Sequence, residues 1–359
     1  MKRPNALKEA AAKEGLECNF LIFNPYNIAY FTGFSGATAL LIPKQGENTL
    51  FVGGVNYEQA KNEAKEVTVE LLKRGENLIE KMATQAPAKK YAVDVLQIES
   101  WRILAKAVGG EEKLEPAGKL ILKLRSVKDE QEIELIREAC KFASVGMKVA
   151  SELICPNIKE IEVAAEVEYA MRKKGSNGTS FDTIIASGPT SAYPHGSCSN
   201  RTIGEGEFVV VDLGATYNSY RSDMTRTFIA GKPDQKQRKI YETVKAAHQK
   251  AFETIKPNVA AQEVDGEARR TIEAAGFGEF FVHNLGHGVG LEIHEAPVLS
   301  PDSKDILTTG NVVTDEPGIY IPGYGGVRIE DTVLVTRDCA EKLTVGLYSP
   351  TCLSRGKTK

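Results

Sequence analysis

The stretch VVVDLGATYNSYRSDMTRTF, residues 209–228, places two acidic residues in extended, largely apolar surroundings. Asp212 follows three valines, and Asp223 lies in the next strand-like segment. Between them, the glycine and asparagine of LGATYNSY favour a connecting loop. The stretch therefore predicts a hairpin with one carboxylate on each strand. Because like charges that face each other across a sheet are destabilising, these acids need either water or a counterion.

The same arrangement recurs in the last third of the chain. Glu316 lies in VVTDEPGIY, where Pro317 favours an extended conformation of the residue before it. Glu330 lies in GVRIEDTVLV, and alternation along a strand puts Arg328 on the same face as Glu330. Burial of four carboxylates without partners would cost many kcal/mol. Either cations accompany these acids or the acids are exposed.

A count of charges predicts how many cations such a cluster needs. One divalent ion leaves two of four carboxylate charges uncompensated, and two ions neutralise the cluster. Oxygen ligands with an added imidazole suit manganese, cobalt, iron or zinc. The stretch GHGVGLEIHE, residues 286–295, holds two of the five histidines of the chain, and His283 lies just upstream. Glycines on both sides of His287 allow a close backbone approach, so His287 is a candidate nitrogen ligand.

The first part of the chain alternates between strands and helices, which predicts a small layered α/β domain over residues 1–125. The segment YFTGFSG, residues 30–36, is expected to be a loop because it contains two glycines. Apolar runs predict the strands, and alanine- and lysine-rich segments predict the helices. The expected elements are a helix at 5–15, strands at 18–23, 37–43 and 48–54, a helix at 56–65 and a strand at 89–95.

The second part, residues 126–359, is expected to use one unit twice. A long amphipathic helix is predicted over 125–154, with Ser126 as its N-cap. The order helix, helix, strands then repeats, although the residues of the two halves do not match, so the repeat is architectural. The overall fold class is α+β. The expected elements after the first helix are a helix at 159–175, strands at 180–188, 207–214 and 220–231, helices at 234–255 and 262–276, and strands at 290–295, 311–322 and 326–336.

The bulk composition fits a globular protein of about two domains, with 359 residues and 42% hydrophobic content. The formal net charge of −3 gives no electrostatic basis for a nucleic-acid partner. No apolar run is long enough for a signal-peptide core or a membrane span. Six scattered cysteines without a C-x-x-C pair favour free thiols. We therefore expect a cytoplasmic protein without a membrane anchor.

Four motifs in a fixed order now carry a resemblance: VVVDLGATYNSYRSDMTRTF, HNLGHGVGLEIHEAP, DEPGIY and GGVRIEDT. Together they resemble the pita-bread (M24-type) metallopeptidase family, which includes methionine aminopeptidase, aminopeptidase P, prolidase and the metal-free relative creatinase. The earlier segment FNPYNIAYFTGFSG resembles the creatinase-type N-terminal domain. The resemblance implies a creatinase-like α/β domain over 1–125. It implies a catalytic pita-bread domain over 126–359, built as a pseudo-twofold repeat of helices and antiparallel strands.

The resemblance also implies a ligand set for two divalent metal ions (Mn, Co, Zn or Fe, with Mn or Co favoured). Asp212 would chelate one ion, His287 and Glu316 would serve the other, and Asp223 and Glu330 would bridge both. All five ligand types are present, so a metal-free, creatinase-like hydrolase is disfavoured.

Further residues match positions that act on substrate in the family. The implied catalytic residues are His283, His294 and Glu316. The implied substrate-binding residues are His195, His283, His294 and Arg328. The remaining histidine, His248, has no counterpart in the family, and we expect a surface or packing role for it. Two small departures from the family pattern are Tyr193, where leucine is more familiar, and Asp315, where an apolar residue is common.

The two-domain length and the GGVRIEDT motif are typical of the proline-directed members of the family. The implied substrate is a peptide with proline at the second position, and an Xaa-Pro dipeptidase is favoured over aminopeptidase P, which acts on longer peptides. A non-catalytic binding module on the same fold is a remote alternative, because such relatives have typically lost ligands. The resemblance further implies a homodimer.

Overall fold

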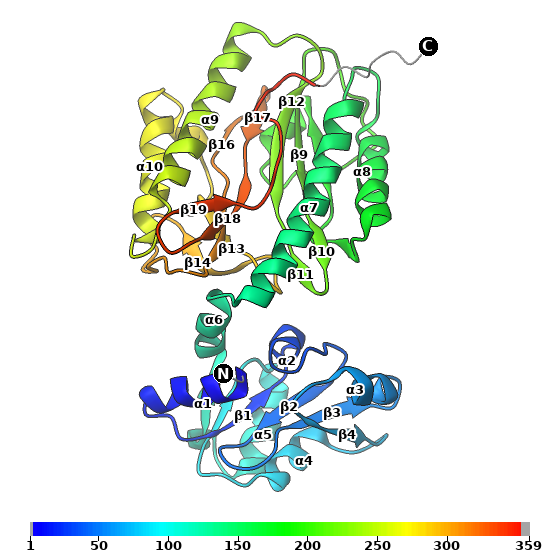
Figure 1. Ribbon diagram of the computed structural model, residues 1–359, viewed down its shortest axis with the longest axis vertical. Coiled ribbons are helices and arrows are strands. Elements are labelled where there is room, and N and C mark those ends of the chain that lie inside the picture. The colour runs from blue at the N-terminus through cyan, green and yellow to red at the C-terminus, as the bar shows by residue number, and fades with distance from the viewer. Residues whose placement is uncertain (1–2, 353–359) are drawn as a thin grey trace. The chain divides into compact units, whose positions relative to one another are not determined.

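The computed structural model of the protein describes residues 3–352. The chain divides into two compact units, Met1–Arg125 and Ser126–Lys359 (Figure 1). The division falls at the last residue of helix α6, Gly118–Ser126. Within the described residues, no helix is both long and apolar enough to span a membrane. The six cysteines are free thiols, as the sequence predicts.

The first unit is built on one mixed sheet of six strands in the order β4-β3-β2-β1-β5-β6. Strand β1 pairs antiparallel with β2 and parallel with β5, and its four residues are buried. The strands are β1 Asn19–Ile22, β2 Ala39–Ile42, β3 Thr49–Gly53, β4 Thr68–Leu72, β5 Tyr91–Val93 and β6 Leu114–Pro116. The helices before α6 are α1 Arg3–Lys13, α2 Pro25–Thr32, α3 Tyr57–Glu63, α4 Leu78–Gln85 and α5 Ile98–Val108.

One expectation for this unit is wrong. The segment 30–36 is not all loop, because Tyr30, Phe31 and Thr32 form the last turn of α2. The Asn24 side chain caps the start of this helix by accepting from two backbone N–H groups. Gly33 ends the helix with a φ of 73°, a left-handed conformation that glycine adopts at little cost. The glycines of this segment therefore mark a helix end and the loop that follows it.

The second unit shows the expected order of helix, helix and strands, used twice. Its first half starts with α7 Glu130–Leu153 and α8 Glu160–Lys174. The three-stranded sheet β12-β9-β8 follows, beside the small sheet β11-β10-β7. These strands are β7 Gly178–Thr179, β8 Ile184–Ser187, β9 Phe208–Leu213, β10 Ala215–Tyr217, β11 Tyr220–Arg221 and β12 Met224–Ile229.

The second half repeats this order with α9 Gln235–Thr254 and α10 Ala261–Ala274. A five-stranded sheet follows, in the order β14-β13-β15-β18-β19, and β16 and β17 form a separate hairpin. These strands are β13 Gly286–Gly288, β14 Glu295–Leu299, β15 Val312–Asp315, β16 Gly318–Ile321, β17 Gly325–Arg328, β18 Asp331–Val335 and β19 Ala340–Lys342. The α+β prediction is therefore confirmed.

Each half of this unit has its own apolar core. In the first half, Met147 and Val167 of the helix pair pack in one cluster with Val209 and Val211 of β9. In the second, Val244 and Ile272 belong to a cluster that includes strand residues such as Val313 and Val333. In Figure 1, α7 and α8 flank β9, and α9 and α10 lie on the other side of the strands. The strands thus form the middle of the unit.

Two expectations in this unit are also wrong. The long helix begins at Asp129, whose side chain and that of Glu132 form a capping box, and Ser126 belongs to α6 instead. The predicted strand 290–295 is absent. The chain there makes turns, and the strands lie on either side, at β13 and β14. A glycine-rich segment supplies little side-chain packing to hold a strand.

Candidate active site

The four strand acids and His287 come from the ends of paired strands in the two halves of the second unit. Asp212 lies near the end of β9 and Asp223 just before β12, and Asp212 is the cross-strand partner of Thr225. Glu316 directly follows β15, and Glu330 directly precedes β18. One ligand-type atom from each of Asp223, His287 and Glu330 lies within 4.8 Å of the others. The structure thus brings together residues that are more than 100 positions apart in sequence.

His287 presents one ring nitrogen to this cluster. Its Nε2 lies 3.3 Å from Glu316 Oε1 and 3.7 Å from Asp223 Oδ2. The other nitrogen, Nδ1, is 3.0 Å from the carbonyl oxygen of Gly288. A histidine that ligates a metal usually donates its second ring N–H to such an oxygen. A Cβ on Gly286 would lie 2.1 Å from the carbonyl oxygen of Thr314, so this strand requires glycine beside His287.

Hydrogen bonds fix the positions of the acids. Thr225 donates through Oγ1 to Glu330 Oε2 at 2.6 Å and accepts from Arg328 Nε at 3.0 Å. Arg328 also donates from Nη2 to Asp212 Oδ2 at 2.7 Å. The other oxygen of Asp212, Oδ1, is buried and has no hydrogen-bond partner. An orphaned, buried carboxylate oxygen facing other acids suits a metal ion.

Mutual repulsion dominates the electrostatics of the cluster. Burial, followed by the charge of Asp212, raises the pKa of Asp223 well above its usual value. Burial and the charge of Asp223 do the same for Glu330. Burial alone would raise the pKa of Glu316, but its hydrogen bond with His287 lowers it to about 2. Burial alone would lower the pKa of His287, but Glu316 raises it to about 9.

The raised pKa values of Asp223 and Glu330 reflect burial together with an excess of negative charge in the cluster. Arg328 is the guanidinium that pairs with this cluster, and it contributes one charge against four carboxylates. Four carboxylates and an imidazole nitrogen form a mainly oxygen ligand set of the kind that divalent transition metals accept. The residues present therefore fit divalent cations.

The remaining predicted residues lie around this cluster. His283 Nε2 is 2.9 Å from the Tyr320 hydroxyl, and His283 Nδ1 is 2.7 Å from the carbonyl oxygen of Asn284. The rings of His287 and His294 pack edge to face, with centroids 4.3 Å apart. His195 is exposed, and the carbonyl oxygen of the preceding residue, Pro194, accepts from Arg328 at 3.1 Å. Arg328 therefore links the acids to the segment that carries His195.

Sequence reasoning missed several residues that hold the site. Tyr320 accepts a hydrogen bond from Arg328 Nη1 at 2.7 Å and contacts His283, and burial raises its pKa to about 12. Tyr320 stands in the DEPGIY motif, so its position was visible although its role was not. Thr225 and Thr314, which donates to Glu316 at 3.0 Å, look like ordinary strand residues in the sequence.

Of the surface and packing roles expected for His248, the structure shows burial, because the residue lies in α9 with 1% of its side chain exposed. In addition, its Nε2 lies 3.1 Å from Asp331 Oδ2. No local feature of the sequence indicates this contact, because His248 and Asp331 are 83 positions apart.

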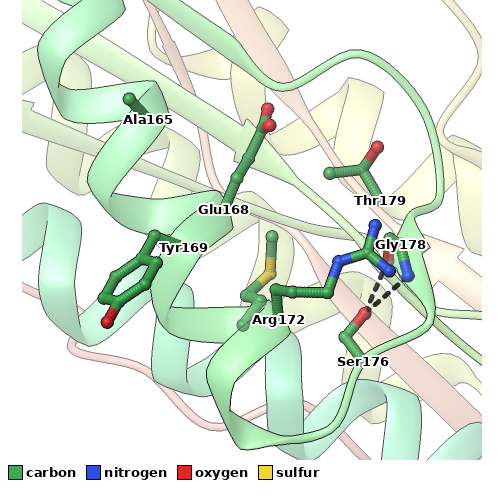
Figure 2. A pocket seen from close by; sticks show the side chains of 8 residues that line it. Ala165, Glu168, Tyr169, Arg172, Ser176, Gly178 and Thr179 are labelled. Atoms are coloured by element: carbon green, nitrogen blue, oxygen red, sulfur yellow. Dashed lines mark hydrogen bonds between the residues drawn. The ribbon is translucent and has the colours of Figure 1, made fainter.

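A separate pocket of about 430 Å³ lies on α8 and β7, away from all of these residues (Figure 2). Its polar groups bond locally: Ser176 Oγ donates to the carbonyl oxygen of Gly178 at 2.6 Å, and Arg172 donates to the carbonyl oxygen of Asn177. With its polar groups engaged in this way, the pocket lacks the convergent, perturbed groups of the acid cluster.

Comparisons with known proteins agree with the fold. The model of metallopeptidase family M24 matches residues 134–337, and that of the creatinase/prolidase N-terminal domain matches residues 3–127. The chain is 44% identical over 324 residues to the Xaa-Pro dipeptidase of Pyrococcus furiosus, which covers 90% of this chain and 92% of that relative. The chain therefore belongs to metallopeptidase family M24.

Two solved structures extend this likeness to three dimensions. The Xaa-Pro dipeptidase from Bacillus anthracis matches with a TM-score of 0.91 at 36% identity, covering 98% of this chain and 99% of that one. The X-Pro aminopeptidase from Thermotoga maritima matches with a TM-score of 0.84 at 34% identity, covering 92% and 96%. The predicted family, with a creatinase-like domain before a pita-bread domain, is confirmed. The protein is a metal-dependent peptidase.

Proposed function

We propose that the protein is a two-metal Xaa-Pro dipeptidase. The observation that carries this proposal is the cluster of four buried or half-buried acids with His287 Nε2 directed into it. The named dipeptidase relatives, up to 44% identical over most of the chain, support the reaction and the substrate class.

In this proposal Asp212, Asp223, His287, Glu316 and Glu330 hold two divalent cations, with manganese or cobalt favoured. Two ions neutralise the four carboxylates, and they would supply Lewis-acid activation of the attacking water and the scissile carbonyl. Asp223 and Glu330, whose pKa values burial and mutual repulsion raise, are the acids that most need cations between them.

The protein's own groups then move the proton and stabilise charge. Glu316 accepts the proton of the attacking water and passes it to the leaving nitrogen of proline, which as a secondary amine must be protonated. Burial lowers the pKa of His294, which favours the neutral imidazole that can donate to the developing oxyanion. One such donor is typically worth about 3 kcal/mol.

His283 is held for substrate contact by two hydrogen bonds. Tyr320 accepts from Arg328 and so turns its own hydroxyl proton toward His283 Nε2. That leaves Nδ1 as the protonated nitrogen, which donates to the carbonyl oxygen of Asn284. His195 and Arg328 are assigned to the substrate side of the cluster, where a dipeptide carboxylate needs positive charge.

The test is hydrolysis by protein that has been stripped of metal and reloaded with manganese or cobalt. Xaa-Pro dipeptides and Xaa-Pro-Yaa tripeptides are compared. Cleavage of the dipeptide supports the proposal. Cleavage of the tripeptide alone supports aminopeptidase P. The similarity to the Thermotoga maritima X-Pro aminopeptidase favours this alternative. Failure to cleave either peptide with every metal would contradict both.

We also propose that the protein is a homodimer, as the family resemblance implies, and that it lies in the cytoplasm, as its composition indicates. Sedimentation of the purified full chain tests the dimer, since a monomer at micromolar concentration would contradict it.

A further inference from the structure

A second buried acidic pair lies directly beside the proposed metal ligands. Asp315 immediately precedes Glu316, and Asp331 immediately follows Glu330. The two aspartates are cross-strand partners on β15 and β18, and both are fully buried. Because like charges directly opposite each other destabilise a sheet, this pair requires compensation.

Asp331 has that compensation on both carboxylate oxygens. Oδ1 lies 2.8 Å from Arg226 Nη2 and accepts from Thr344 Oγ1 at 2.7 Å. Oδ2 accepts from the Tyr348 hydroxyl and lies 3.5 Å from Lys342 Nζ. Burial alone would raise the pKa of Asp331, but Arg226 and His248 hold it well below its usual value.

The carboxyl group of Asp315 has far fewer compensating partners than that of Asp331. Neither of its carboxyl oxygens has a hydrogen-bond partner, although the side chain is fully buried. Its ion-pair contact is with His248, whose Nε2 lies 3.6 Å from Asp315 Oδ2 and 3.1 Å from Asp331 Oδ2. Neither contact has linear hydrogen-bond geometry. The His248 ring therefore lies within reach of both acids.

Both residues of this contact fall outside the family pattern. His248 has no counterpart in the resemblance, and Asp315 stands where an apolar residue is common. They come from segments 67 positions apart, on α9 and β15, and meet in the interior of the second unit. An aspartate that replaces an apolar side chain in a core needs a polar partner, and His248 is in place to provide it.

We infer that His248 is a positioning residue, which compensates the Asp315–Asp331 pair and thereby fixes the spacing of Glu316 and Glu330. The inference rests on the proposed function, since it treats those two glutamates as metal ligands. Removal of the ring leaves two facing carboxyls with one fewer partner. Strands β15 and β18 then shift relative to each other, and the adjoining ligands move with them.

The test is a double-mutant cycle on the full chain with His248→Leu and Asp315→Asn. Mn²⁺ affinity is measured by titration calorimetry, and the urea midpoint of unfolding is measured on metal-free protein. His248→Gln retains a side-chain amide that can donate to the acids, so it serves as the conservative variant. Val244→Ala serves as the matched control, because it removes buried volume from the same face of α9.

We expect His248→Leu to weaken Mn²⁺ binding about 10-fold or more, as changes to residues behind metal ligands typically do. His248→Gln should recover most of the loss, and Val244→Ala should lower the urea midpoint without a comparable loss of affinity. In the Asp315→Asn background, His248→Leu should weaken Mn²⁺ binding less than about 3-fold, because the repulsion that His248 compensates is gone.

Two results would overturn the inference: Mn²⁺ affinity unchanged in His248→Leu, or losses that multiply independently in the double variant. If His248→Leu does not fold, the same comparison is made with His248→Gln in both backgrounds. If wild-type protein binds neither Mn²⁺ nor Co²⁺, the proposed function fails. The urea midpoints of the single and double variants then still decide whether His248 compensates Asp315.

Discussion

Two clusters of carboxyls meet at β15 and β18, where Asp315 precedes Glu316 and Asp331 follows Glu330, and the two clusters are compensated differently. Around Asp331, the protein supplies Arg226, Lys342 and His248. Beside Asp223 and Glu330 lies the guanidinium of Arg328. This group forms its ion pair with Asp212. The first cluster is charge-balanced by its own side chains, and the second is not.

The direction of the carboxyl pKa shifts distinguishes a structural ion cluster from a metal site. In the balanced cluster the pKa of Asp331 lies well below its usual value, although burial opposes this, because cations surround it. In the unbalanced cluster the pKa values of Asp223 and Glu330 lie well above their usual values, because burial and other acids dominate. Adjacent residues on one strand can thus differ in role according to which positive groups their face meets.

The largest loss of activity is expected for a substitution at Asp223. Asp223→Asn removes one charge from the acid that both cations would share, and we expect kcat/KM for an Xaa-Pro dipeptide to fall by at least about 1,000-fold. Even residues behind metal ligands typically contribute 10- to 100-fold. Steady-state kinetics with excess Mn²⁺ measures the effect. Asp182→Asn, at an exposed acid, is the control and should leave the rate unchanged. Comparable activity in the two variants would contradict the assignment.

A substitution in the balanced cluster should lower the free energy of unfolding. Arg226→Met removes the cation that pairs with Asp331 Oδ1 at a fully buried site, and breaking a buried pair in this way typically costs about 3–5 kcal/mol. The free energy of unfolding of metal-free protein in urea measures it. The exposed pair Arg270–Glu267 offers the control, since Arg270→Met should cost less than about 1 kcal/mol. Equal costs for the two substitutions would show that the Asp331 cluster does not depend on its own cations.

A smaller effect is expected at Tyr320, which joins Arg328 to His283. Tyr320→Phe removes one hydroxyl and leaves the buried Arg328 and the half-buried His283 with one fewer hydrogen bond, at a cost of about 1–3 kcal/mol. We expect kcat/KM to fall roughly 10-fold, with Mn²⁺ affinity nearly unchanged. The Tyr324 hydroxyl has no hydrogen-bond partner, so Tyr324→Phe is a matched control on the same hairpin. A Tyr320→Phe enzyme with wild-type kinetics would show that this link does not serve the reaction.

Much of the fold could be predicted from the sequence because the signals were local. The valine run before Asp212 predicts a buried strand, and the periodic apolar positions after residue 130 predict α7. The boundaries were less predictable. Asp129 and Ser126 are both acceptable N-caps, and the capping box with Glu132 decides between them.

The site divides in the same way. Acids in apolar strands are visible as local anomalies, so Asp212, Asp223, Glu316 and Glu330 could be picked out together. The compensation of Asp331 could not, because Arg226, His248 and Lys342 come from three separate elements and meet only in the folded chain. The roles of Tyr320 and Thr225 could not be predicted for a related reason, because a hydroxyl on a strand has no defined role until its partners are placed.

Two divalent cations are proposed to neutralise the unbalanced cluster. The decisive measurement is calorimetric titration of metal-free wild-type protein with Mn²⁺, with metal content measured on the loaded protein. We expect two ions per chain in wild type and in Asp182→Asn, and loss of bound ions in Asp223→Asn. Wild-type protein that binds no divalent transition metal and still hydrolyses peptides in the presence of a chelator would contradict it.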